Sequence, residues 1–199
     1  MKRRPAARFT TSAMVVLILA TGSPSAVLGQ GHDGHTPSPQ QGDFGAQGSG
    51  GGPLVRVVRD ATERFKNVRV AEGAGYFLQF GCVSGPDAGA MGLHYVNFPL
   101  VMDGVLDPAR PEIVIYEPAG NGRVRLVGAD YLVLADAWDA THDSPPQLMG
   151  QLLHYFEAPN RFGLPPFYTL HVWAWKENPT GTFVNWHSNV SCDAFPGNQ

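Results

Sequence analysis

The chain has 199 residues, of which 43% are hydrophobic and 16% charged, so it has enough apolar side chains to form a core. Its 24 glycines and 17 prolines argue against a coiled coil or a helical bundle, because those classes are rich in Ala, Glu, Lys and Leu. Aromatic residues reach 11%, a share that favours a β-sheet.

The N-terminus has the pattern of a secretory signal peptide. Four basic residues lie among the first eight, the apolar run AMVVLILA follows at residues 13–20, and small residues precede Gly29. The apolar run is too short for a transmembrane helix, which needs about 20 residues. We therefore predict a signal peptide over residues 1–29. The mature protein should be secreted or extracytoplasmic and have no membrane span.

The mature chain is expected to be acidic and to begin with a linker. Loss of the four N-terminal cations leaves 10 basic and 17 acidic residues, a net charge of −7 that offers no attraction for nucleic acid. Residues 30–53 hold eight glycines together with Gln and Pro, and Phe44 is their only large apolar side chain. Such a segment cannot bury enough surface to fold, so we predict a disordered linker followed by a single domain over residues 54–199.

The expected elements are one helix and a series of strands. Apolar residues recur at steps of three and four over residues 54–71, which predicts an amphipathic helix that begins near Pro53. The period then changes to that of β-structure, and we predict these strands: residues 76–83, 94–98, 112–117, 123–134, 165–176 and a short return at 183–186. The expected fold class is α+β, with one N-terminal amphipathic helix packed on a mostly antiparallel, open or barrel-like sheet.

The two cysteines, Cys82 and Cys192, are expected to form a disulfide. An even number of cysteines in an exported chain favours this pairing. Two thiolate metal ligands are the weaker alternative, because no CxxC spacing supports them. The bond would tie the C-terminus to the first predicted strand.

The strand over residues 165–176 carries the first candidate site residue. Successive side chains of a strand point to opposite faces, so His171 shares a face with Thr169 and Trp173, while the other face is apolar. With both faces covered, a histidine needs a hydrogen bond, a carboxylate or a metal as partner.

Two further residues complete a candidate metal site. His94 opens a short strand, and Glu117 ends an apolar strand face. Together with His171 they could bind Zn, Cu or Fe and leave positions open for water or substrate. The alternative is a pair of hydrogen-bonded histidines, with Glu117 paired to an arginine across the hairpin. His154 and His187 are reserve ligands.

A different hypothesis needs no metal. Trp173 and Trp175 lie on the same strand face as His171 and could stack on a glycan or another small-molecule ligand, although buried tryptophans are common in cores. No GxSxG or HExxH motif is present, so the sequence does not decide whether the protein is an enzyme.

Three segments resemble a known group of proteins: residues 89–97 (GAMGLHYVN), residues 111–118, and residues 170–181 (LHVWAWKENPTG). They are similar to segments of a family of exported bacterial proteins with no established activity. The resemblance covers most of residues 76–192 and implies export and a single domain, without assigning a site. Three functions follow as hypotheses: a metal-binding pocket that is catalytic or not, a metal-free extracellular binding module, and a structural envelope protein.

Overall fold

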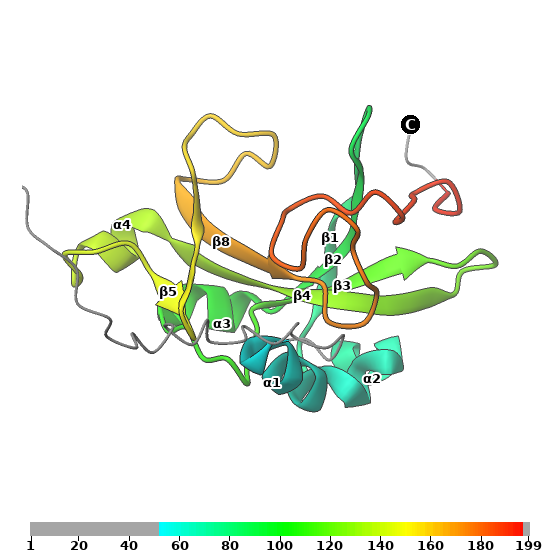
Figure 1. Ribbon diagram of the computed structural model, residues 1–199, viewed down its shortest axis with the longest axis horizontal. Helices are drawn as coiled ribbons and strands as arrows, with labels where there is room; N and C mark the ends of the chain where they lie inside the picture. Colours follow the sequence, from blue (N-terminus) through cyan, green and yellow to red (C-terminus); the bar gives the residue numbers. More distant parts are fainter. Residues whose placement is uncertain (1–51, 197–199) are drawn as a thin grey trace, which may run out of the picture. The chain divides into compact units, whose positions relative to one another are not determined.

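The computed structural model describes residues 52–196, so the predicted signal peptide and nearly all of the predicted linker lie outside the described residues. The main feature is a curled antiparallel sheet of six strands in the order β1-β2-β3-β4-β8-β7 (Figure 1). Its strands are β1 Phe77–Gly85, β2 Gly89–Val96, β3 Ile113–Pro118, β4 Val124–Leu134, β7 His154–Phe156 and β8 Phe167–Val172. A two-stranded ribbon is formed by β5 Gln147–Leu148 and β6 Gln151–Leu152.

The helices are short, and the described chain is mostly β. They are α1 Pro53–Thr62, the 3-10 helix η1 Glu63–Lys66, α2 Val68–Gly73, α3 Phe98–Asp103 and α4 Ala135–Asp139. Where one continuous helix was expected over residues 54–71, the chain forms α1, η1 and α2. The break has a local cause, since Asn67 is extended and its side chain accepts a hydrogen bond from the backbone N–H of Arg69, which caps α2.

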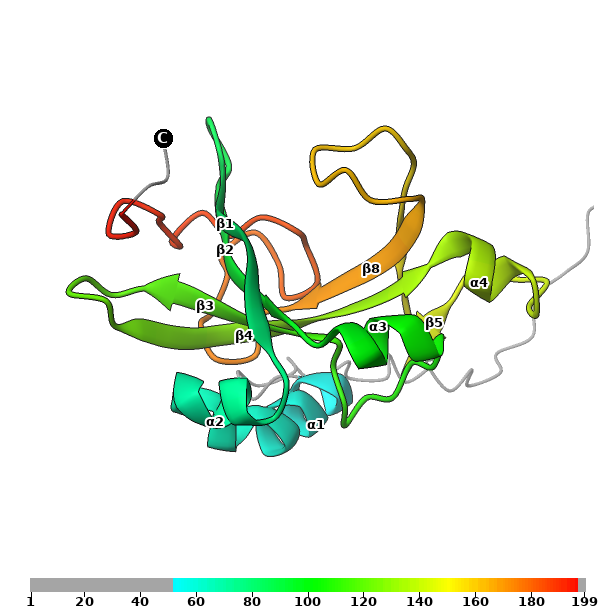
Figure 2. The ribbon, with the colours of Figure 1, turned by 180° about the vertical axis from the view of Figure 1, so that it is seen from behind.

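The sheet has one face covered by helix and another that holds polar side chains. Both ribbon views show α1 and α2 on one side of the sheet and the loop between β7 and β8 on the other (Figures 1 and 2). Leu54, Val55 and Val58 of α1 are buried with apolar residues of β4 and β8, among them Tyr131 and Leu170. Asp130 is adjacent to Tyr131 in β4, and His171 is adjacent to Leu170 in β8. Their side chains therefore point to the opposite face of the sheet.

Each helix within residues 52–196 is too short or too polar to cross a membrane. Most strands begin and end within two residues of their predicted ranges. The exceptions are β2, which begins at Gly89 and so places His94 inside the strand and not at its start, and β8, which ends at Val172. Residues 183–186 form no strand.

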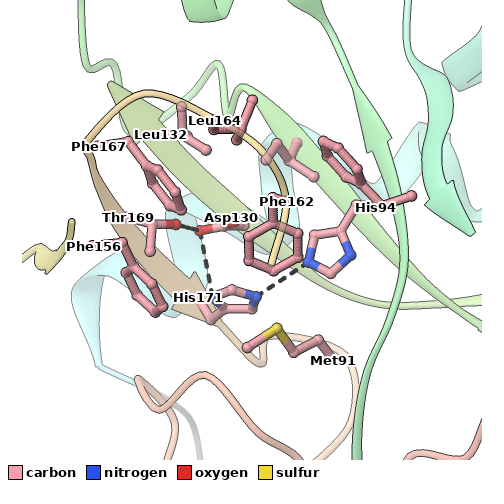
Figure 3. A pocket seen from close by; sticks show the side chains of 12 residues that line it. Met91, His94, Asp130, Leu132, Phe156, Phe162, Leu164, Phe167, Thr169 and His171 are labelled. Atoms are coloured by element: carbon pink, nitrogen blue, oxygen red, sulfur yellow. Dashed lines mark hydrogen bonds and ion pairs between the residues drawn. The ribbon is translucent and has the colours of Figure 1, made fainter. Parts of the chain in front are cut away.

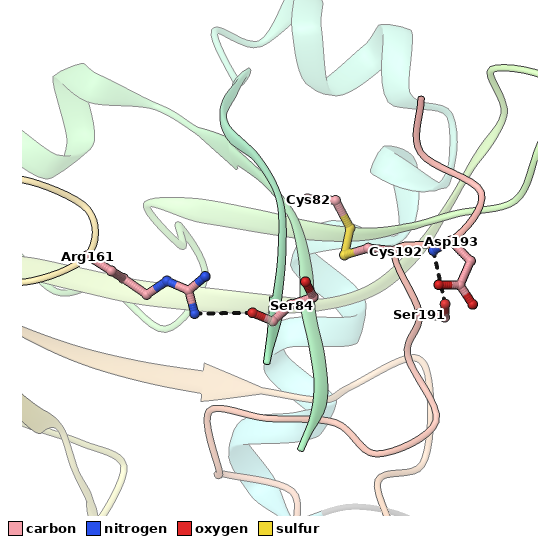
Figure 4. Close-up of a disulfide and its surroundings, with 6 residues drawn as sticks. All are labelled: Cys82, Ser84, Arg161, Ser191, Cys192 and Asp193. Carbon is pink, nitrogen blue, oxygen red and sulfur yellow. Dashed lines mark hydrogen bonds between the residues drawn. A yellow bond between two sulfur atoms is a disulfide. The ribbon is translucent and has the colours of Figure 1, made fainter. Parts of the chain in front are cut away.

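The predicted disulfide is confirmed. Cys82 and Cys192 are bonded, with their Cα atoms 5.7 Å apart across 110 residues of sequence (Figure 4). In the chain-entropy model a loop of this length contributes about 4–5 kcal/mol to stability. The C-terminal segment is also held by a bridge between Ala90 and His187. The bond therefore attaches the end of the chain to β1, as the sequence predicted.

Candidate metal centre

The strand register brings two of the predicted ligands and one further carboxylate to the same face of the sheet. His94 of β2 lies opposite Ile115 of β3, and Ile113 of β3 lies opposite Asp130 of β4. Asp130 in turn lies opposite His171 of β8. Directly opposed residues point to the same face, so His94, Asp130 and His171 converge. Their potential ligand atoms all lie within 4.8 Å of one another.

The two histidines face each other through their Nε2 atoms. These atoms are 3.3 Å apart, and the rings are inclined by 77° (Figure 3). Two nitrogens that each lie about 2.0–2.1 Å from a tetrahedral zinc ion are roughly 3.3–3.4 Å apart. The pair therefore has the separation that a shared metal ion requires.

Asp130 lies next to the His171 ring. Its Oδ1 is 3.5 Å from Nδ1 of His171 and accepts a hydrogen bond of 2.5 Å from the Thr169 hydroxyl (Figure 3). A potential ligand atom of Asp130 lies within 4.8 Å of one on each histidine, so the carboxylate could be the third ligand of an ion that the two imidazoles share. Thr169 would then hold this ligand in place from outside the coordination sphere.

Burial sets the protonation of the group. His94, Asp130 and His171 are each at most 5% exposed. Burial lowers the pKa of His94 to about 4, with the nearby His171 adding to this effect. Burial likewise lowers the pKa of His171 to about 3. It raises the pKa of Asp130 to about 6, against the opposing effects of His94 and the Thr169 hydrogen bond. At pH 7 the group holds two neutral imidazoles and a carboxylate, which is the form that binds metals.

The hydrogen bonding of the two histidines is incomplete. Nδ1 of His94 is buried and makes no hydrogen bond, and Nδ1 of His171 is buried with only its 3.5 Å contact to Oδ1 of Asp130. An unsatisfied buried polar group costs about 1–3 kcal/mol, so such atoms need an explanation. The alternative of two histidines fully satisfied by protein hydrogen bonds therefore fits the structure poorly.

The group forms the floor of a pocket on the face of the sheet opposite α1. The pocket is small, with about 30 Å³ of space that a water-sized molecule can occupy, and it opens to solvent. Apart from the three candidate ligands and Thr169, its lining is apolar: Phe80, Met91, Ile113, Leu132, Phe156, Phe162, Leu164 and Phe167 (Figure 3). Polar atoms are thus confined to one end of an otherwise hydrophobic space.

The structure does not bring the predicted ligand Glu117 into this group. Both of its carboxylate oxygens accept hydrogen bonds from Lys176, at 2.7 and 2.9 Å, and Arg125 lies 4.0 Å away across the hairpin. Glu117 follows a bulge after Ile115 and pairs with Arg125, so it lies farther along β3 than the row that faces Asp130. The carboxylate beside the two histidines is Asp130.

Asp130 lies within a strand whose sequence is otherwise largely apolar, so the local pattern does not mark it as a metal ligand. It is the one charged residue in the run from Leu126 to Leu134. A carboxylate in the middle of a buried strand is costly unless it is paired, and this signal could have identified it.

The two predicted platform residues are engaged in the core. Trp173 is 3% exposed and donates its indole N–H to the carbonyl oxygen of Val184. Trp175 donates to Thr62, and Lys66 lies over its ring, with Nζ 4.0 Å from the ring centroid. Trp173 is therefore buried in the core, and Trp175 is partly buried with Lys66 over its ring, so the two do not form one exposed aromatic surface.

The reserve histidines also lie outside the candidate metal centre. His154 is exposed on β7, with Nδ1 3.4 Å from Oδ1 of Asn185. His187 is fully buried, accepts a hydrogen bond from the backbone of Asn189 and packs edge-on against Trp173. The position of His187 holds the C-terminal segment in place.

Comparison of the chain with protein-family models, with curated proteins and with solved structures finds no match. The resemblance to exported bacterial proteins therefore stays an expectation from the sequence. The assignment of a function depends on the geometry of the site.

Proposed function

We propose that this protein is an exported domain that binds one transition metal ion through His94, Asp130 and His171. The observation that carries the proposal is the 3.3 Å separation of the two histidine Nε2 atoms within a buried group that also contains a carboxylate. Imidazole nitrogens suit Zn, Cu and Fe, and the tetrahedral spacing favours Zn²⁺. The disulfide supports the export part of the proposal, because such bonds persist in oxidising compartments.

Three protein ligands leave a coordination position for water or a substrate. In catalytic zinc sites this open position is the reactive one, where the metal acts as a Lewis acid. The apolar lining above His94 and His171 would restrict the access of water to that position. This arrangement would suit catalysis, and it would equally suit the capture of a ligand on the metal.

The decisive test is the metal content of the purified, disulfide-bonded protein. After removal of metal with a chelator, the protein should take up about one equivalent of Zn²⁺, measured by calorimetry and elemental analysis. Co²⁺ should give the intense visible absorption of a four-coordinate ion. His94→Ala and His171→Ala should lose this binding, because each removes an imidazole ligand.

His142→Ala is the matched control, since it removes an exposed histidine that stacks on Trp138 and is not part of the candidate metal centre. This variant should bind metal like the wild type. If the wild type takes up none of Zn²⁺, Cu²⁺ and Fe²⁺, or if His142→Ala loses metal as fully as His171→Ala, the proposal is wrong.

A second candidate function is a binding domain that needs no metal. The apolar lining of the pocket favours it, because small-molecule sites are mostly hydrophobic with a few polar groups that orient the ligand. In this case Thr169, Asp130, His171 and His94 would serve as a hydrogen-bonding floor. Ligand binding that is unchanged in the presence of a chelator would identify this function.

A further inference from the structure

The candidate metal centre has very little free space beside it. The pocket that it lines has about 30 Å³ of space that a water-sized molecule can occupy. A cavity needs about 10–15 Å³ of such space to hold one water molecule. The pocket therefore has room for one or two water-sized groups beside His94, Asp130 and His171, and any larger ligand would have to displace its walls.

Aromatic rings form a connected wall of the pocket. Phe156 and Phe167 are stacked, with centroids 5.1 Å apart and planes inclined by 5°. Phe162 contacts Phe167 edge-on at 6.3 Å and Phe80 edge-on at 5.4 Å. Aromatic rings are stabilised by such offset and edge-to-face contacts. Because the rings contact one another, moving one of them to admit a larger ligand would cost its contacts with its neighbours.

The loop between β7 and β8, which carries Phe162, is held at several points. Arg161 donates a hydrogen bond to the carbonyl oxygen of Ser84 in β1, at the other end of the sheet (Figure 4). Within the loop, Asn160 donates to the carbonyl oxygen of Leu164 at 2.9 Å. Its Oδ1 accepts from the backbone N–H groups of Phe162 and Leu164, each at 3.2 Å. The small size of the pocket is therefore supported by contacts that fix its wall.

The charge of the candidate metal centre limits the ligand further. A divalent ion held by Asp130 and two neutral imidazoles keeps a single positive charge. Asp130 is the only lining residue that is charged at pH 7, and the lining beyond the ligands and Thr169 is apolar. A buried charge that nothing balances is costly. A further ligand with one negative charge makes the group neutral, whereas a neutral ligand leaves the positive charge uncompensated.

We infer that the open position on the metal takes a monovalent anion of about the size of water, the class that includes hydroxide and fluoride, and excludes larger ligands. The inference rests on the proposed metal site. The size limit is set by the aromatic wall, and the charge by the balance between a divalent ion and Asp130. The apolar lining adds to the exclusion, because it offers a larger polar molecule no hydrogen bonds in place of its lost hydration.

The first test uses fluoride and the Co²⁺-loaded full mature protein at pH 7. Co²⁺ is paramagnetic, so a fluoride ion that coordinates it and exchanges with the solution has a broadened ¹⁹F NMR signal. The loaded protein should broaden this signal, and the metal-free protein should not. Acetate, a larger monovalent anion, should leave the visible Co²⁺ spectrum of the wild type unchanged.

Variants with a larger pocket convert the exclusion of acetate into a gain of binding, which a damaged fold cannot mimic. Phe162→Ala and Leu164→Ala each remove part of the wall without removing a metal ligand. Acetate should shift the visible Co²⁺ spectrum of at least one of them, with an affinity at least about tenfold above that of the wild type. Phe98→Ala is the control and should exclude acetate, because Phe98 is 48% exposed on α3 and does not line the pocket.

The same variants test the preference for a negative charge. Acetamide has nearly the shape of acetate but is neutral. It should bind the variant that accepts acetate at least about tenfold more weakly than acetate does. The visible Co²⁺ spectrum measures both affinities under the same conditions.

The outcomes separate this inference from the proposed function. Absence of Co²⁺ binding by the wild type overturns the metal site and the inference together. Normal Co²⁺ binding without broadening of the fluoride signal overturns the inference alone. Acetate binding to the wild type as tightly as to both enlarged variants, or equal affinities for acetate and acetamide, has the same consequence.

Discussion

Thr169 donates a hydrogen bond of 2.5 Å to Asp130 from the neighbouring strand, and both side chains are buried. This contact holds the Asp130 carboxylate beside Nδ1 of His171. Thr169 therefore orients the candidate metal centre without being one of its ligands.

Thr169→Val should weaken metal binding and leave the fold intact. The substitution keeps the shape of the side chain but removes the hydroxyl, so Asp130 loses its donor. Loss of such a supporting hydrogen bond typically weakens metal affinity by about 10- to 100-fold. The free energy of unfolding of the metal-free protein should fall by about 1–3 kcal/mol. Competition with a chromophoric chelator measures the affinity, and Thr169→Ser, which keeps the hydroxyl, should stay close to the wild type.

Asp130→Asn and Glu117→Gln each replace a carboxylate with an amide, but only Asp130→Asn should weaken metal binding. Asp130→Asn removes the candidate carboxylate ligand, so the protein should lose most of its affinity for Zn²⁺. Glu117→Gln removes a partner of Lys176 and should cost about 1 kcal/mol of stability while metal stoichiometry stays at about one. Elemental analysis after dialysis distinguishes them. Retention of metal by Asp130→Asn together with loss by Glu117→Gln would restore Glu117 as the ligand.

Gly128→Ala should disturb the candidate metal centre through the backbone. A Cβ at Gly128 would lie 2.5 Å from the carbonyl oxygen of Val172, next to His171, so β4 and β8 would have to separate there. We expect a loss of stability of about 1–3 kcal/mol and weaker metal binding, because the register that places Asp130 opposite His171 is strained.

Gly73→Ala is the control for this change. A Cβ at Gly73 would meet no atom within 4 Å, and this glycine ends α2. The variant should be as stable as the wild type or more stable by up to about 1 kcal/mol, with unchanged metal affinity. Urea unfolding and a metal titration of both variants make the comparison, and equal behaviour of the two would contradict the close approach of β4 to β8.

Stability should decline with rising pH because of Glu112. This side chain is 1% exposed and accepts a hydrogen bond from the backbone N–H of Leu132, and burial raises its pKa from 4.5 to about 8. The folded state therefore holds a proton that the unfolded state releases between about pH 4.5 and 8. The contribution of this group is fully present below pH 4.5 and is lost as the pH rises through about 8.

The variant Glu112→Gln isolates this contribution. It cannot ionise, so the unfolding free energy of the wild type minus that of Glu112→Gln should decrease as the pH is raised from 5 to 9. The decrease should be up to about 4–5 kcal/mol, because one pKa unit corresponds to about 1.4 kcal/mol. Urea unfolding of metal-free protein at several pH values measures it. A difference that stays constant or grows with pH would show that Glu112 is ionised in the folded protein.

The local patterns of the chain were sufficient for several features. Alternation along the strand at residues 167–172 placed His171 on a face with Thr169, and the even cysteine count predicted the bond between Cys82 and Cys192. The apolar side chains on both faces of this strand predicted that both would be covered, which the burial of all six of its residues confirms. These inferences were possible because the direction of a side chain on a strand depends only on the residues next to it.

The carboxylate of the candidate metal centre depended on tertiary structure. Asp130 joins the histidines because β4 lies between β3 and β8, with Asp130 opposite His171. Glu117 is excluded because a bulge after Ile115 and the pairing with Lys176 place it elsewhere. Strand order and register are set by contacts between segments far apart in the chain, so spacing along the sequence cannot reveal them. The sequence by itself thus determined the types of side chain available and the faces on which they lie, and tertiary structure decided which of them meet.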